Sequence, residues 1–202
     1  MELTLTWKEN ITTALPKFVQ TVTSPGALTS AGRALRNAIV RNLISLPPNR
    51  AFPAASTGFW ERAAASVTQP LVAGLGVLVS ITQLGVRQRY LGGVIAAPPG
   101  KNLTIPAQEA AYGHRAREFD LKVAFMGKST SGVPILALVS GNPRTSGQRN
   151  VMYWLVPAVN QEPNPNVLPT LKALRRAFGM GLRAFVNSQM GRGTVSINDF
   201  DV

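Results

Sequence analysis

The residues best suited to phosphate chemistry are Gly127-Lys128-Ser129-Thr130, which look like the end of a phosphate-binding loop. Such a loop also needs a glycine five residues before the glycine that precedes the lysine, so that backbone amides can wrap the phosphates. That position holds Lys122. We therefore interpret this stretch as a turn between strands.

Acid–base or metal chemistry would have to use His114, the one histidine, with some of the nine carboxylates. No His-Glu-x-x-His spacing and no Gly-x-Ser-x-Gly elbow is present, and the chain has no cysteine. The closest acidic pair, Glu118 and Asp120, stands among cations that favour ion pairing: Arg115, Arg117 and Lys122. We predict that the chain is not an enzyme and holds no cofactor or metal, and we expect His114 to be structural or solvent-exposed.

The charge balance points to an anionic partner. Twenty-one Lys and Arg residues against nine Asp and Glu give a formal net charge of +12. A field of this size favours nucleic acid, a membrane surface or an acidic protein face. The longest apolar run, Leu71 to Ile81, is about half of the ~20 residues that a membrane span requires, and no signal peptide is expected at the N-terminus. We therefore expect a soluble protein of the cytoplasm with no membrane partner.

The basic residues of the last predicted helix are the best candidates for contact with that partner. The helix is expected from Pro169 or Thr170 to about Met190, with one apolar stripe that packs on a sheet. The candidate partner-contacting or DNA-contacting residues on it are Lys172, Arg175, Arg176 and Arg183. Evenly spaced cations on a helix can neutralise phosphates without reading bases. A solvated face that keeps an assembly soluble is the alternative reading.

A glycine- and proline-containing loop, expected over residues 141–150, supplies two further cations. Arg144 and Arg149 are additional candidates for contact with a partner or with DNA. The loop has little to bury, so we expect it to be mobile or to contact a partner.

The order of elements predicts the fold. Three helices are expected before the strands. The first covers residues 7–22 and is weakened at Pro16. The second begins at a cap on Thr29 or Ser30 and ends at Leu46, and the third covers residues 58–66. Apolar runs separated by turn residues then predict strands at 71–72, 77–81, 94–95, 103–105, 122–125, 135–139 and 151–156. We predict an α+β fold, a mainly antiparallel sheet packed against N-terminal helices and one long C-terminal helix. Residues 1–190 are expected to form a single domain and 191–202 a C-terminal arm.

Several stretches, taken in order, carry a resemblance to a known family. Gly85 to Ile95 has the pattern of a short helix followed by an aromatic-x-Gly-Gly-x-Ile turn, and Leu103 to Ala107 has that of the next strand. Tyr153 to Val159, with the prolines up to Pro169, has that of a strand and a proline-rich lead into the last helix. In this order the stretches resemble the phage virion morphogenesis family, over roughly residues 3–187.

The resemblance implies a structural role without catalysis. It implies a neck or tail-completion protein of Mu-like tailed phages, arranged as a homomeric ring at the head–tail junction. The chain would be assembled in the bacterial host cytoplasm and located in the virion. It would contact connector proteins and tail tube or terminator proteins, with its positive charge facing DNA in the channel or an acidic partner ring. Tyr90, Gly92 and Gly93 are candidates for an assembly turn, because paired glycines permit a tight turn or a close backbone approach.

Two other function classes compete with this expectation. The first is a sequence-nonspecific, basic DNA-binding protein that acts as a free monomer or dimer. The second, which the residues favour least, is a hydrolase.

Overall fold

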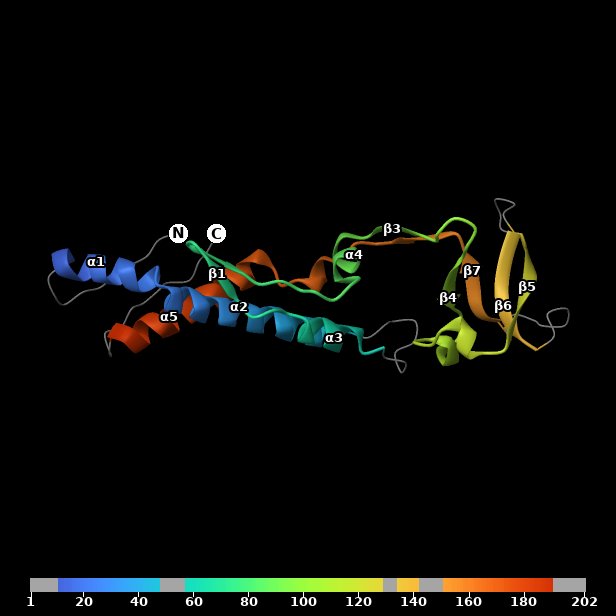
Figure 1. Cartoon of the computed structure of the whole chain (residues 1–202), viewed down its shortest axis with the longest axis horizontal. Helices are drawn as coiled ribbons and strands as arrows, with labels where there is room; N and C mark the ends of the chain where they lie inside the picture. The colour runs from blue at the N-terminus through green and yellow to red at the C-terminus, as the bar shows by residue number, and fades with distance from the viewer. Residues whose placement is uncertain (1–10, 48–56, 129–133, 142–150, 191–202) are drawn as a thin grey trace. The chain divides into compact units, whose positions relative to one another are not determined.

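The computed structural model describes residues 11–47, 57–128, 134–141 and 151–190 (Figure 1). The chain divides into two compact units. Residues 1–46, 60–86 and 165–202 form the helical unit, and residues 47–59 and 87–164 form the sheet unit. The chain passes between the units four times, at 46/47, 59/60, 86/87 and 164/165. Neither unit is a contiguous piece of sequence, and a single domain over residues 1–190 stays a prediction.

The N-terminal helices are α1 (Ile11–Val22), which contains Pro16, and α2 (Pro25–Ser45). The Ser24 hydroxyl caps α2, because it accepts a hydrogen bond from the amide of Ala27 at 3.2 Å. Pro25 follows at the first helical position, where a missing N–H costs nothing. The predicted cap at Thr29 or Ser30 is therefore wrong, whereas the predicted end at Leu46 is confirmed. The start expected for α1 at residue 7 lies outside the described residues.

The long C-terminal helix α5 (Leu171–Met190) packs on α2. Gly181 lies against the backbone of α2, and its carbonyl accepts a hydrogen bond from the hydroxyl of Ser30 at 2.9 Å. A Cβ at Gly181 would stand 2.7 Å from Ser30 O and 2.8 Å from Ala31 Cα, so only glycine permits this approach. The prediction that α5 packs on a sheet is wrong about the partner, which is a helix.

A β-hairpin completes the helical unit. Strands β1 (Leu71–Ala73) and β2 (Gly76–Leu78) pair antiparallel, as the glycines between the two apolar runs predicted. Gly74 opens the two-residue turn with φ of +57°, the sign that a type II′ turn needs there. The short helix α3 (Phe59–Ala65) precedes the hairpin and agrees with the predicted helix at 58–66.

The sheet unit contains two antiparallel sheets. The larger has the order β4-β7-β6-β5, formed by β4 (Leu103–Pro106), β5 (Leu121–Lys128), β6 (Pro134–Ser140) and β7 (Val151–Val156). The smaller pairs β3 (Gly93–Ala96) with β8 (Ala158–Gln161). β8 lies between Pro157 and Pro163, and its pairing partner is β3 of the same unit.

Tyr153 anchors the core of the sheet unit. Its side chain is almost fully buried, and its hydroxyl donates to the backbone carbonyl oxygen of Ala111 at 3.0 Å. The backbone carbonyl oxygen of His114 is a second acceptor, 3.1 Å from the same hydroxyl. Burial raises the pKa of the Tyr153 phenol above its ordinary value. This bond ties β7 to the short 3₁₀ turn Glu109–Ala111, so the loop between β4 and β5 is fixed to the sheet.

The structure confirms the α+β class, with antiparallel sheets and a long C-terminal helix. The packing differs in detail from the prediction. The four-stranded sheet belongs to the sheet unit, and the sheet that packs on a long helix is the β1–β2 hairpin against α2.

Candidate functional site: a cationic groove between two helices

A groove of about 620 Å³ runs between α2 and α5 in the helical unit. Its apolar lining is made of Pro169 and of small or unbranched side chains: Ala34, Ala38, Ala173, Ala177 and Met180. Small residues at these positions let the helices approach at Gly181 and leave a shallow trough beside the contact. The groove therefore follows from the same alanine and glycine positions that permit close helix packing.

Polar and charged side chains form the remaining lining: Asn37, Arg41, Asn42 and Ser45 from α2, and Arg176 from α5. Asn42 is fixed in place, because its amide nitrogen donates to the carbonyl oxygens of Asn166 and Val167 at 3.0 and 3.1 Å. Arg41 and Arg176 are both solvent-exposed. Guanidinium groups bind carboxylates and phosphates with two parallel hydrogen bonds, so this lining suits an anionic ligand.

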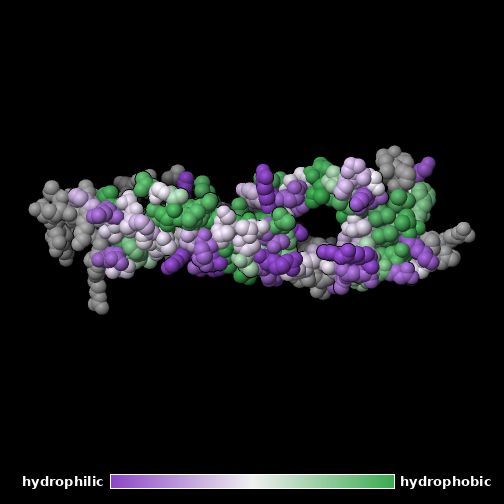
Figure 2. Space-filling view, viewed as in Figure 1, coloured by the Kyte–Doolittle hydropathy of each residue, from purple (hydrophilic) through white to green (hydrophobic). Residues whose placement is uncertain are grey.

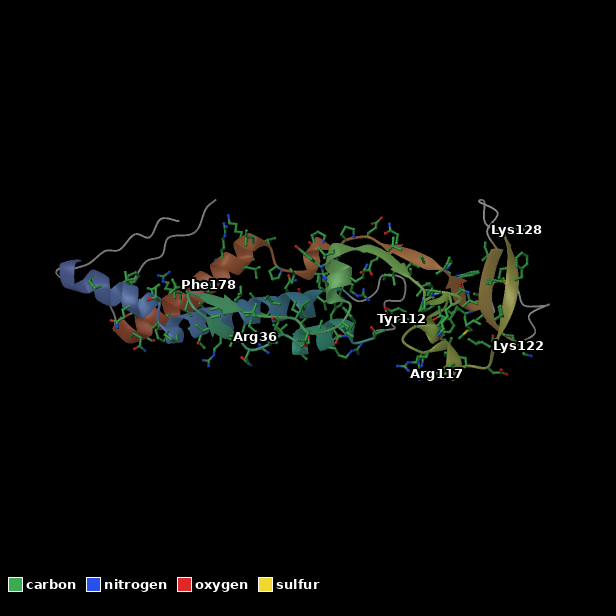
Figure 3. All side chains as sticks on the ribbon, turned by 45° about the horizontal axis from the view of Figure 1, so that its top comes forward. Arg36, Tyr112, Arg117, Lys122, Lys128 and Phe178 are labelled. Carbon is green, nitrogen blue, oxygen red and sulfur yellow. The ribbon has the colours of Figure 1, made fainter. Side chains whose placement is uncertain are left out.

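The charge of the helix pair is of one sign. Over their described lengths, α2 and α5 contain seven Arg or Lys residues and no Asp or Glu. The cations are Arg33, Arg36 and Arg41 on α2 and Lys172, Arg175, Arg176 and Arg183 on α5. Arg36 has a structural contact, since its Nε donates to the carbonyl oxygen of Val67 at 3.2 Å (labelled in Figure 3). The pair as a whole can attract an anionic partner over a wide surface.

The structure places the predicted contact residues of α5 in two different environments. Arg176 lines the groove, whereas Lys172, Arg175 and Arg183 lie on α5 outside that lining. Lys172 and Arg175 are exposed and Arg183 is half-buried. Arg144 and Arg149 lie outside the described residues. The four cations predicted together on α5 are thus not all brought to one site.

Sequence reasoning missed Arg41 as a site residue. Arg41 is one of three arginines on α2, and nothing in that helix alone shows which of them will face another helix. The signal is the shared alanine spacing of the two helices, Ala34 and Ala38 on α2 and Ala173 and Ala177 on α5, four residues apart in each. Such spacing is typical of helices that pack closely. A closely packed α2–α5 pair could have been expected from it, with Arg41 and Arg176 near the contact.

The predicted turn at Gly92 and Gly93 has the expected backbone. It follows the short helix α4 (Val86–Leu91), and both glycines have positive φ, of +69° and +109°. A Cβ at Gly92 would stand 2.5 Å from the amide nitrogen of Pro163, so the two backbones meet closely. The Gln88 side chain donates to the carbonyl oxygen of Gly92 at 2.9 Å, and Tyr90 is partly exposed. The close approach is within one chain, and a role of this turn in assembly stays a prediction.

His114 is exposed, as predicted, and lies with its Nδ1 3.0 Å from Oε2 of Glu118. This hydrogen bond lowers the pKa of the Glu118 carboxyl. The structure thus gives Glu118 His114 as its hydrogen-bond partner, and the expected ion pairing of Glu118 and Asp120 with Arg115, Arg117 and Lys122 stays a prediction. Within the described ranges, no three His, Asp or Glu side chains gather as metal ligands would. None of the helices in the same ranges has the length and apolar character that a membrane span requires.

Comparison with known proteins returns no match: no family model, no curated protein and no solved structure is similar to this chain.

Proposed function

We propose that this chain is a structural virion protein of a tailed bacteriophage, a neck or tail-completion protein that forms a homomeric ring at the head–tail junction. The ordered resemblance of residues 3–187 to the phage virion morphogenesis family supports the class of protein. The α+β fold, with α4 leading into the Gly92 turn, is compatible with it.

The observation that carries the proposal is the acid-free α2–α5 pair with its groove. A ring at the junction lies beside DNA and beside other proteins, and both can present rows of anionic groups. Seven cations on two packed helices attract such a row over a wide surface, and Arg41 and Arg176 can fix one anionic group in the groove.

Particles tested by peptide mass spectrometry should contain this chain. We expect tailed particles, induced from the strain that carries the gene and purified by density gradient, to hold it in a fixed ratio to the tail tube protein. The reason is that a ring component is built in and not released. Particles that infect normally and lack the chain would contradict a permanent place in the virion.

The same helix pair favours a second candidate, a sequence-nonspecific DNA-binding protein acting as a free monomer or dimer. Each neutralised phosphate contributes about 0.9 to the slope of log affinity against log salt on duplex DNA. Tight, salt-sensitive binding to random duplexes by a small free species, together with absence from particles, would favour this candidate over the ring protein.

A further inference from the structure

The β1–β2 hairpin has one face buried against α2 and one face turned away from it. Gly32 of α2 makes the buried contact possible, since a Cβ there would stand 2.5 Å from Pro70 Cβ and 2.6 Å from Val77 Cγ1. Arg36 holds the same segment through the carbonyl oxygen of Val67. Because side chains alternate along a strand, Leu71 and Leu78, which pair directly, lie on the opposite face from Val72 and Val77.

The outward face is apolar and solvent-exposed. Leu71 is 62% exposed, Leu78 56% and Leu75, at the turn, 80%. Figure 2 shows green, hydrophobic surface in the region of the hairpin. Single exposed leucines are common, but three exposed leucines on one short hairpin are a local concentration of apolar surface, and such concentrations typically mark an interaction surface.

This hairpin is also free of charge in a strongly charged chain. From Ala63 to Val86 no residue is acidic or basic, whereas the whole chain carries a formal +12. Contacts between two copies bring like charges together over most of the surface, and this repulsion disfavours association. A charge-free segment such as this hairpin lets a second copy approach with less of this repulsion. The cores of protein interfaces are likewise depleted of charged residues.

The outer strands of the four-stranded sheet carry features that oppose pairing with another chain. β5 carries Lys122 and Lys128 near its two ends (Figure 3) and has a register shift between Phe125 and Gly127, and β4 ends at Pro106. Lysines, bulges and prolines are features that keep an edge strand from pairing with another chain. β1 and β2 contain no lysine, proline or bulge.

We propose that the outward face of the β1–β2 hairpin, formed by Leu71, Leu75 and Leu78, is the contact between copies of this chain. A lipid surface fits less well, because segments that bind membranes place Lys or Arg beside their apolar residues and this stretch contains none. The inference rests on the proposed homomeric ring, in which each copy uses two different surfaces, and it assigns one of those two surfaces.

The test compares the association of three proteins by analytical ultracentrifugation from micromolar to submillimolar concentration. The parent should associate. The double variant Leu71→Gln, Leu78→Gln should have an association constant lower by about tenfold or more, since it loses two leucines that the contact would bury. A control double variant, Val19→Gln with Ile44→Gln, changes side chains of similar exposure, 51% and 60%, on helices of the same unit and should associate as the parent does. Circular dichroism should show that all three fold alike, because the changed side chains are exposed; if the hairpin variant does not, Leu75→Ser at the turn replaces it.

Three results would overturn the assignment. They are a parent that is monomeric throughout the range, a hairpin variant that associates as the parent does, or equal weakening by the control. The lipid alternative is tested by sedimentation with vesicles of phosphatidylglycerol and phosphatidylcholine. If the parent binds the vesicles and the hairpin variant does not, the hairpin is a lipid-binding surface and the assignment to a second copy is wrong. The presence of the chain in particles does not depend on these results, so the hairpin can fail while the proposed virion role stands.

Discussion

Gly181→Ala should destabilise the helical unit, although alanine is the better helix former. In an exposed helix the change would stabilise by about 1 kcal/mol. At this position the new methyl group meets Ser30 O and the Cα of Ala31, both of them backbone atoms that cannot turn aside. The two helices must then separate, and overpacking of this kind costs about 1–3 kcal/mol. Denaturant unfolding followed by far-UV circular dichroism measures the change in the free energy of unfolding.

Asn187→Ala is the matched control, since it also introduces alanine into α5 but at an exposed position. It should leave the free energy of unfolding unchanged or slightly raised. A Gly181→Ala protein as stable as the parent would mean that α2 and α5 do not touch at Gly181, and the groove beside that contact would lose its basis.

Removing the two groove arginines should impair function and spare folding. Arg41→Gln with Arg176→Gln leaves the melting temperature within a few degrees, because exposed charges contribute only about 0–1 kcal/mol each. The variant should reduce the yield of complete particles, if the groove holds an acidic protein segment. If the partner is DNA, its affinity should fall and the salt slope should decrease by about 1.8, for two lost phosphate contacts.

The control for this pair is Arg33→Gln with Arg175→Gln. These arginines are exposed on the same two helices and lie outside the groove lining. Both double variants replace two arginines by glutamine, so they change the net charge of the chain equally. Equal effects of the two double variants would show that the helix pair acts through its total charge alone. No effect of either would make the cationic surface a solvated face, and the candidate site would be wrong.

Local signals in the sequence predicted most of the elements. The end of α2 at Leu46, the hairpin around Gly74 and the span of α5 follow from proline, glycine and apolar spacing, which act within a few residues. The start of α2 was misplaced because Thr29 and Ser30 are also good caps. Ser24 followed by Pro25 at the first helical position is the stronger local signal.

The features that depend on distant pairing were not predictable in this way. β8 is four residues long and lies between prolines, so it becomes a strand only because β3 pairs with it. The apolar stripe of α5 suggested a partner sheet, whereas α5 packs on α2, with Gly181 against the backbone of α2. The groove arises from that approach, which is why Arg176 was found from sequence and Arg41 was not.

The most direct test of the central claim is an electron cryomicroscopy reconstruction of the neck of the particles, with this chain located in the density. We expect a closed ring of identical copies at the head–tail junction, with the α2–α5 groove against DNA or against an acidic partner protein. A neck whose density is fully accounted for by other proteins would contradict the account.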